Sequence, residues 1–267
     1  MAVRKRKRIE AFDVVLFAVL TLFALLILIP VYLVFVTSFM PHSLYIQNPV
    51  QFFPKVLTLT NYTYIVENCS LLSSYLNSIV NTALSVCYGL VCTVCMGYAL
   101  SFKDVPGRRF VFVYMVITMF FGGGMIPNYL LVSSLHLTGT RWAMLLPFCI
   151  SQFNLIIMIN SFKSLPHELE EAALIDGLGY LGILRRIIVP LSTAAIATVG
   201  LYYAVFFWND WFNSLIYLNK EQYPVMLFLR NIVNGTAMVG DGAGSADKSS
   251  LGIAIKSAVI IVSTLPI

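Results

Sequence analysis

The residues with the clearest chemical character form a short charged stretch between two apolar segments, Glu168-Leu-Glu-Glu-Ala-Ala-Leu-Ile-Asp-Gly177. Pro166 precedes it and suits the first turn of a helix, because its missing N–H needs no partner there. The glutamates that follow place negative charge near the positive end of that helix. Gly177 then supplies a left-handed stop, about three turns on. The stretch therefore predicts a short helix that carries carboxylates and ends at Gly177.

Small side chains mark one face of this predicted helix. On a 3.6-residue period the residues that share this face are Leu169, Ala172, Ala173 and Asp176. The two alanines leave a shallow strip that another protein surface can approach closely. We expect the strip, flanked by Glu171, to be a docking surface; the alternative is an ordinary amphipathic helix in a loop.

No other pattern in the chain predicts a catalytic or nucleotide-binding site. Gly122-Gly123-Gly124 lacks the lysine and the strand-to-helix context of a phosphate loop. Cys92 and Cys95 form a C-x-x-C with no second pair and no histidine nearby, so packing in an apolar core is the favoured interpretation. Neither an H-E-x-x-H motif nor a paired intramembrane aspartate is present, which argues against an intramembrane enzyme. We expect no catalytic residue, no metal site and no cofactor bound by this chain.

The composition predicts a chain embedded in a membrane. Hydrophobic residues make up 59% and charged residues 11% of its 267 residues, and the mean hydropathy is +0.84; soluble domains carry about 25% charged residues. About 20 apolar residues cross a bilayer as a helix. We therefore predict an all-α fold, a polytopic bundle of six transmembrane helices over residues 12–267, after a basic amino terminus at 1–11. The expected spans lie near residues 12–39, 76–102, 110–131, 142–162, 187–207 and 251–267.

The first and third of these runs carry further information. The first run is longer than the roughly 7 to 15 apolar residues of a signal peptide and has no small-residue cleavage site, so we expect it to stay as an anchor. Gly122-Gly123-Gly124 and Pro127 interrupt the third run and predict a bend there.

The distribution of Lys and Arg predicts the orientation of the chain. Basic residues concentrate at the amino terminus from Arg4 to Arg8, in the segment 103–109 and in the loop 163–186. Cytoplasmic segments carry an excess of Lys and Arg. We therefore expect these three parts inside the cell, and the segments 40–75 and 213–250 outside. The net charge of +5 follows from this bias, so we expect membrane lipid around the chain and no nucleic acid partner.

Three short strings in the charged loop carry a family resemblance. Glu171-Ala172-Ala173, Asp176-Gly177 and the later Ile188-Val189-Pro190 resemble the EAA motif of inner-membrane permeases of ABC importers. The longer string from Phe162 through Leu165-Pro166 to Gly177 is most similar to the carbohydrate-uptake branch, related to maltose permeases. The similarity extends over nearly the whole chain. It implies a non-catalytic permease subunit for an oligosaccharide or polysaccharide fragment, located in the plasma or inner membrane of a prokaryote and forming half of a translocation pathway.

The same resemblance implies partners. A separate dimer of ATP-binding subunits would hold ATP and Mg²⁺ and contact the coupling loop 163–186. A second permease subunit, in a heterodimer, and an extracytoplasmic solute-binding protein would complete the importer. The residues assigned to ATPase coupling are Glu171, Ala172, Ala173, Asp176 and Gly177. The resemblance also favours a carboxy-terminal tail beyond the last run, which stops while still apolar.

Polar and aromatic residues at membrane depth are candidates for the cargo pathway, because an unsatisfied polar group in hydrocarbon is costly. Rings can stack on sugars, and Asn or Asp can bond to hydroxyl groups. The candidates are Asn128, Asn154, Trp208, Asn209 and Asp210, with Gln152 as a further polar neighbour. The alternative is an interfacial aromatic belt with hydrogen bonds between helices.

The outer segment 213–250 has the aromatic and arginine character of a protein interface. We expect Tyr223, Phe228 and Arg230 to contact the solute-binding protein; the alternative is an aromatic belt on the membrane surface.

A secondary, ion-coupled solute transporter is the alternative function, since it too has apolar helices broken by Gly and Pro. It needs buried charges for ion coupling, and the runs hold almost none apart from Lys256 and the boundary pair Asp13 and Asp210.

Overall fold

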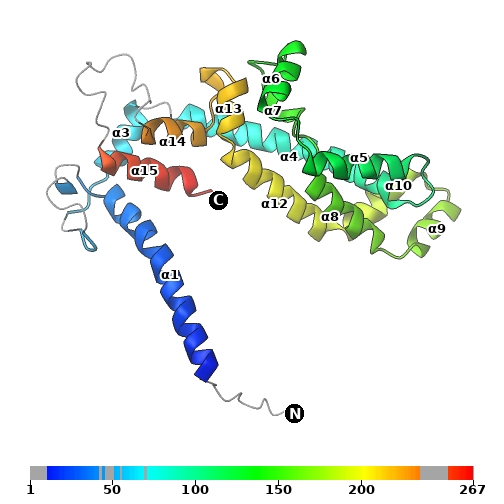
Figure 1. The fold of residues 1–267 in the computed structure, drawn as a ribbon, viewed down its shortest axis with the longest axis horizontal. Coiled ribbons are helices and arrows are strands. Elements are labelled where there is room, and N and C mark those ends of the chain that lie inside the picture. The colour runs from blue at the N-terminus through cyan, green and yellow to red at the C-terminus, as the bar shows by residue number, and fades with distance from the viewer. Residues whose placement is uncertain are drawn as a thin grey trace. The chain divides into compact units, whose positions relative to one another are not determined.

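The computed structural model describes residues 11–41, 44–45, 51–54, 56–68, 71–234 and 252–266. These residues form helices and no strand (Figure 1), so the predicted all-α class is confirmed for this part of the chain. The basic cluster from Arg4 to Arg8, Cys69 and the glycine-rich segment 235–244 lie outside the described residues. The chain divides into two compact units, one made of Met1–Ser70 with Asn231–Ile267 and the other of Leu71–Arg230.

The first unit contains a long apolar helix and two shorter helices. They are α1 (Ala11–Ser38), α3 (Thr60–Asn68) and α15 (Ile253–Thr264), and α15 packs against both α1 and α3. Asn61 on α3 donates to the carbonyl oxygens of Ser38 and Met40, each at 2.9 Å. Ser38 Oγ and Tyr62 Oη are also hydrogen-bonded, at 2.7 Å. The carbonyl groups at the end of α1 have no hydrogen-bond donor within the helix, and Asn61 supplies donors for two of them.

The second unit is built around α4 (Leu71–Ser101), which packs along both α8 (Gln152–Lys163) and α12 (Thr193–Asn209) (Figure 1). Small residues on α4 allow this close approach. A Cβ atom added to Gly89 would lie 3.2 Å from the Cys149 carbonyl oxygen and 3.3 Å from the ring of Tyr203. One added to Gly97 would lie 3.1 Å from Met158. Larger residues at these positions would push the three helices apart.

The remaining helices of this unit are short. They are α5 (Arg108–Phe120), α6 (Met125–Ser134), α7 (Trp142–Leu145), α9 (Glu168–Ile175), α10 (Tyr180–Ile183), a π-helical turn at Leu184–Ile188, α11 (Val189–Leu191), α13 (Phe212–Tyr217) and a 3₁₀ turn at Lys220–Gln222. The helix α14 (Val225–Val233) follows them.

The apolar helices in the described ranges are less regular than six continuous spans. Two helices are long and apolar enough to cross alone, Phe12–Ser38 and Leu71–Ser101. Two bent pairs bring the count to four if each pair is one span, and α15 is a shorter apolar helix. The predicted spans near 142–162 and 187–207 are each divided between more than one helix, and the number of six crossings stays a prediction.

Glycine and proline explain the breaks. The helices α5 and α6 meet at an angle of 120°, with Gly124 in a positive-φ conformation (φ 85°) between them, which confirms the predicted bend. Pro147 lies in the non-helical segment between α7 and α8, where its ring and its missing N–H disfavour a helix. The third break follows Pro190, and the two sides are bent by 84°.

Candidate functional site

The charged stretch forms α9, and its end has the expected geometry. Gly177 has φ 81°. Its N–H donates to the Leu174 carbonyl and the N–H of Leu178 donates to the Ala173 carbonyl, both at 3.0 Å. This pair of bonds is the Schellman motif, in which a left-handed glycine lets the chain turn back over the last helical carbonyls. Local sequence chemistry therefore sets where α9 stops.

The two alanines of α9 do not share one exposed strip. Ala173 is buried, at 4% exposure, in a cluster with Tyr98, Phe162 and Ile183. Ala172 is exposed. The expectation that Ala172 and Ala173 together present a docking strip is wrong, because Ala173 packs inside its own chain. Ala173 instead holds α9 on the core.

The exposed face of α9 has a different composition. It consists of residues spaced by three or four positions, namely Glu168, Glu171, Ala172 and Ile175. Ile175 is 87% exposed, and Leu181 on the following helix is 79% exposed. Neither of these apolar residues was predicted as part of the docking surface. The signal for Ile175 was its spacing of three from Ala172 and four from Glu171.

The core beneath α9 links it to the ends of two long helices. Tyr98, near the end of α4, makes edge contacts with Phe102 and with Phe162 near the end of α8, at centroid distances of 4.9 and 6.2 Å. Phe102 contacts Tyr180 of α10 at 5.7 Å. If α9 or α10 moved, it would therefore press on aromatic side chains at the ends of α4 and α8.

Basic residues surround the same end of the helices. Arg108, the first residue of α5, donates from Nε to the Leu100 carbonyl at 2.9 Å. Burial, together with the nearby cations Arg108 and Lys103, lowers the pKa of Lys163 at the end of α8. Cations near helix carboxyl ends are favoured by the helix dipole.

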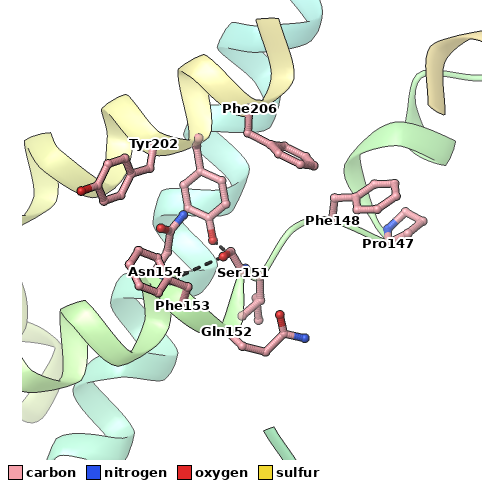
Figure 2. A pocket seen from close by; sticks show the side chains of 10 residues that line it. Pro147, Phe148, Ser151, Gln152, Phe153, Asn154, Tyr202 and Phe206 are labelled. Carbon is pink, nitrogen blue, oxygen red and sulfur yellow. Dashed lines mark hydrogen bonds between the residues drawn. The ribbon is translucent and has the colours of Figure 1, made fainter. Parts of the chain in front are cut away.

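A cavity of about 540 Å³ opens beside the start of α8. It is lined by Pro147, Phe148, Ile150, Ser151, Gln152, Phe153, Asn154, Tyr202, Tyr203 and Phe206. Figure 2 shows Tyr202 and Phe206 on α12 and Gln152 to Asn154 at the first turn of α8. Aromatic faces with a few amide and hydroxyl groups are the lining that a polyhydroxylated ligand needs. Of the predicted pathway residues, Asn154 lines this cavity, together with its predicted polar neighbour Gln152.

Tyr203 holds the wall of the cavity in place. Its hydroxyl accepts the Ser151 N–H at 2.9 Å and is hydrogen-bonded to Thr93 Oγ1 of α4 at 2.7 Å. The side chain is 2% exposed. Tyr202, Phe153 and Phe206 were not predicted; the spacing of four between Tyr202 and Phe206 was the available signal for a shared helix face.

The other predicted pathway residues lie outside the lining of this cavity. Asp210, at the end of α12, accepts hydrogen bonds from the backbone and side chain of Asn213, at 3.0 to 3.1 Å. Burial raises the pKa of Asp210, and the bonds from Asn213 oppose that shift. Asn209 donates to the Val205 carbonyl at 2.8 Å, and the ring of Trp208 meets that of Tyr75 at 5.9 Å. Asn128 is exposed on α6.

The segment that leads into α14 is hydrogen-bonded to α4. Asn77 on α4 donates to the Glu221 carbonyl at 2.8 Å, and Ser78 Oγ accepts the Val225 N–H at 2.8 Å. Arg141 donates to Asn77 Oδ1 at 3.1 Å. These bonds position the backbone on both sides of Tyr223. Tyr223 and Phe228 are half-buried.

Within the described residues, no group of three or more His, Cys, Asp or Glu side chains could hold a metal ion. In the same ranges the cysteines are free: Cys87, Cys92, Cys95 and Cys149.

Comparison with known proteins assigns the chain to a family. No protein-family profile matches it. It is 38% identical over 262 residues, 96% of this chain and 91% of the relative, to the polygalacturonan/rhamnogalacturonan transport system permease protein YtcP of Bacillus subtilis (strain 168). It is 40% identical over 244 residues to protein LplC of the same organism, covering 90% of this chain and 82% of the relative. The chain belongs to the family of carbohydrate ABC transporter permeases.

A solved structure extends the agreement to the fold. The permease resembles a chain of a bacterial ABC transporter involved in the import of the acidic polysaccharide alginate, with a TM-score of 0.89 and 29% sequence identity. The match covers 99% of this chain and 95% of the other. The resemblance drawn from the EAA-like motif is therefore confirmed, and the permease is a membrane protein of a carbohydrate ABC transport system.

Proposed function

We propose that this permease forms half of the translocation pathway of an ATP-driven carbohydrate importer and is coupled to its ATPase through α9. The observation that carries the proposal is the exposed face of α9, with Glu171, Ala172 and Ile175 outward and Ala173 packed against the ends of α4 and α8. A helix held in this way can receive a partner on one side and press on long helices on the other. Asp176 and Gly177 form the turn that ends it.

The cavity between α8 and α12 is the proposed cargo site in this subunit. The helix α8 begins at the cavity with Gln152 and ends at the α9 core with Lys163. Its 12 residues span roughly 18 Å at 1.5 Å per residue. Motion of α9 is therefore transmitted to the cavity along one short helix. YtcP is named for polygalacturonan/rhamnogalacturonan transport, and the similar solved structure is of a transporter involved in alginate import, so an acidic saccharide is the first cargo to test.

The remaining parts of the proposal concern assembly and topology. Six crossings result if the bent pairs, the α7–α8 segment and α15 each count as one span beside α1 and α4. The amino terminus and α9 lie in the cytoplasm of a prokaryote, and Tyr223, Phe228 and Arg230 face the solute-binding protein. A second permease, in a heterodimer, and a dimer of ATP-binding subunits with ATP and Mg²⁺ complete the importer.

Site-specific crosslinking tests the coupling surface. In a background cleared of native cysteines, Ala172→Cys and Ile175→Cys are each co-expressed with the candidate ATP-binding subunit, and ATP-sensitive crosslinks are measured. We expect products from both positions. Ala173→Cys is the matched control on the same helix and should give none, because that side chain is buried. Failure of both exposed positions, with both proteins present in the membrane, would remove α9 as the coupling element.

A further inference from the structure

An arginine stacked on a tryptophan stands out near the end of α12. The Arg230 guanidinium carbon lies 4.0 Å from the centre of the Trp211 ring. Both side chains are half-buried. Phe212, 42% exposed, meets Trp211 edge-on at 5.3 Å. Segments separated in the sequence, α14 and the α12–α13 junction, are therefore joined by a cation on an aromatic surface.

The charge of Arg230 is not neutralised by a carboxylate in the described part of the chain. There, the acid–base pair within 4.0 Å is His167 with Glu170, on α9. Asp210 is adjacent to Trp211 in sequence, but its two carboxylate oxygens accept hydrogen bonds from Asn213. A cation–π contact uses the flat face of a guanidinium and leaves the N–H groups at its edge available.

That geometry suits one type of ligand group. The edge of a guanidinium forms two parallel hydrogen bonds to a carboxylate, and a stacked guanidinium is already oriented for them. The cavity offers a contrast, because its lining contains no Lys, Arg or His. The cavity therefore offers hydrogen-bonding groups without a cation, whereas Arg230 offers a cation.

We propose that Arg230, stacked on Trp211, binds the carboxylate of an acidic sugar and makes this permease selective for uronate-containing oligosaccharides. The inference rests on the proposed function, since it requires carbohydrate to pass along this subunit. Arg230 acts as a specificity residue, and Trp211 positions its guanidinium. The alternative role, contact with the solute-binding protein alone, is an outcome of the test.

Direct binding to the permease complex, purified with its co-expressed partners in nanodiscs, tests the inference. The solute-binding protein is omitted, because it applies a selectivity of its own. The probes are trigalacturonate and its carboxyl-reduced counterpart, galactotriose. Arg230→Gln should weaken the binding of trigalacturonate about tenfold or more and leave that of galactotriose unchanged. Arg230→Lys should fall between, because it keeps the charge but loses the planar pair of donors.

Lys220→Gln is the matched control, since it removes an exposed cation from the same outer segment. It should leave the affinity for both sugars unchanged. Equal loss of both sugars in Arg230→Gln, no loss of either, or a wild-type complex that does not prefer trigalacturonate would overturn the inference.

ATP-driven uptake by the complete reconstituted importer separates this result from the proposed function. Uptake of any oligosaccharide by the wild type upholds the importer assignment even if Arg230 shows no selectivity. Absence of uptake for every sugar, acidic or neutral, contradicts the proposed function itself.

Discussion

Tyr203 shows how a single side chain can hold together the wall of a cavity. It extends from α12, and its hydroxyl bonds both to Thr93 on α4 and to the backbone N–H of Ser151 before α8. Gly89 leaves the room that its ring occupies, with a Cβ position only 3.3 Å away. A hydroxyl at this point supplies the hydrogen bond that the interrupted helix at 146–151 lacks.

The first prediction concerns this hydroxyl. Tyr203→Phe leaves the Ser151 N–H without its acceptor, which should cost about 1–3 kcal/mol of stability. Thermal unfolding of the detergent-solubilised permease measures the effect. Tyr202→Phe is the control, because Tyr202 is 45% exposed at the cavity. Equal shifts in the two variants would show that the hydrogen bonds of Tyr203 are not what matters.

At the scale of the element, α9 is a helix whose backbone hydrogen bonds are all local. It has eight residues, too few for a stable isolated helix. Its position depends on the burial of Ala173 and on the reversal at Gly177, where Leu178 packs against the same core as Ala173. Tertiary packing at one residue and a left-handed turn at another therefore determine which face of α9 is exposed.

The second prediction tests that turn. Gly177→Ala forces a residue with a Cβ atom into φ 81°, at a cost of about 1 kcal/mol. No atom lies within 4 Å of the added Cβ, so the effect is purely conformational. We expect reduced uptake by an importer that still assembles, measured by uptake and copurification of the ATPase. Gly179→Ala, at φ −75° and equally open, should retain full uptake; identical behaviour of the two variants would contradict the role of the left-handed turn.

At the scale of the whole molecule, the unit of residues 71–230 contains both proposed sites. The helices α4, α8 and α12 pack along one another, with the cavity beside the first turn of α8 and the α9 core at its other end. At Gly89 and Gly97 these helices are in such close contact that an added Cβ atom would be crowded. Because packed interiors transmit strain, displacement of α9 should change the cavity.

The third prediction separates cargo contact from coupling. Tyr202→Ala and Phe206→Ala each remove an exposed ring from the cavity, which should lower the affinity for cargo by about 1 kcal/mol, or about fivefold. Transport assays over a range of sugar concentrations measure this as a higher half-saturation concentration. The crosslink from Ile175→Cys to the ATPase should be unaffected. Leu201→Ala, an exposed neighbour on α12 outside the cavity lining, should transport normally; a similar defect there would show that the rings have no specific contact with cargo.

The sequence by itself determined the helical membrane class, the family, the bend at Gly122–Gly124 and the end of α9 at Gly177. These features depend on composition or on the local chemistry of a few consecutive residues, such as a backbone that only glycine adopts easily. The tertiary structure decided which side chains are accessible. It buried Ala173 and exposed Ile175, tied Asp210 to Asn213, and gathered Tyr202, Phe206 and Asn154 around one cavity. Helical periodicity shows which residues share a face, but only the packing of distant segments determines which face is covered.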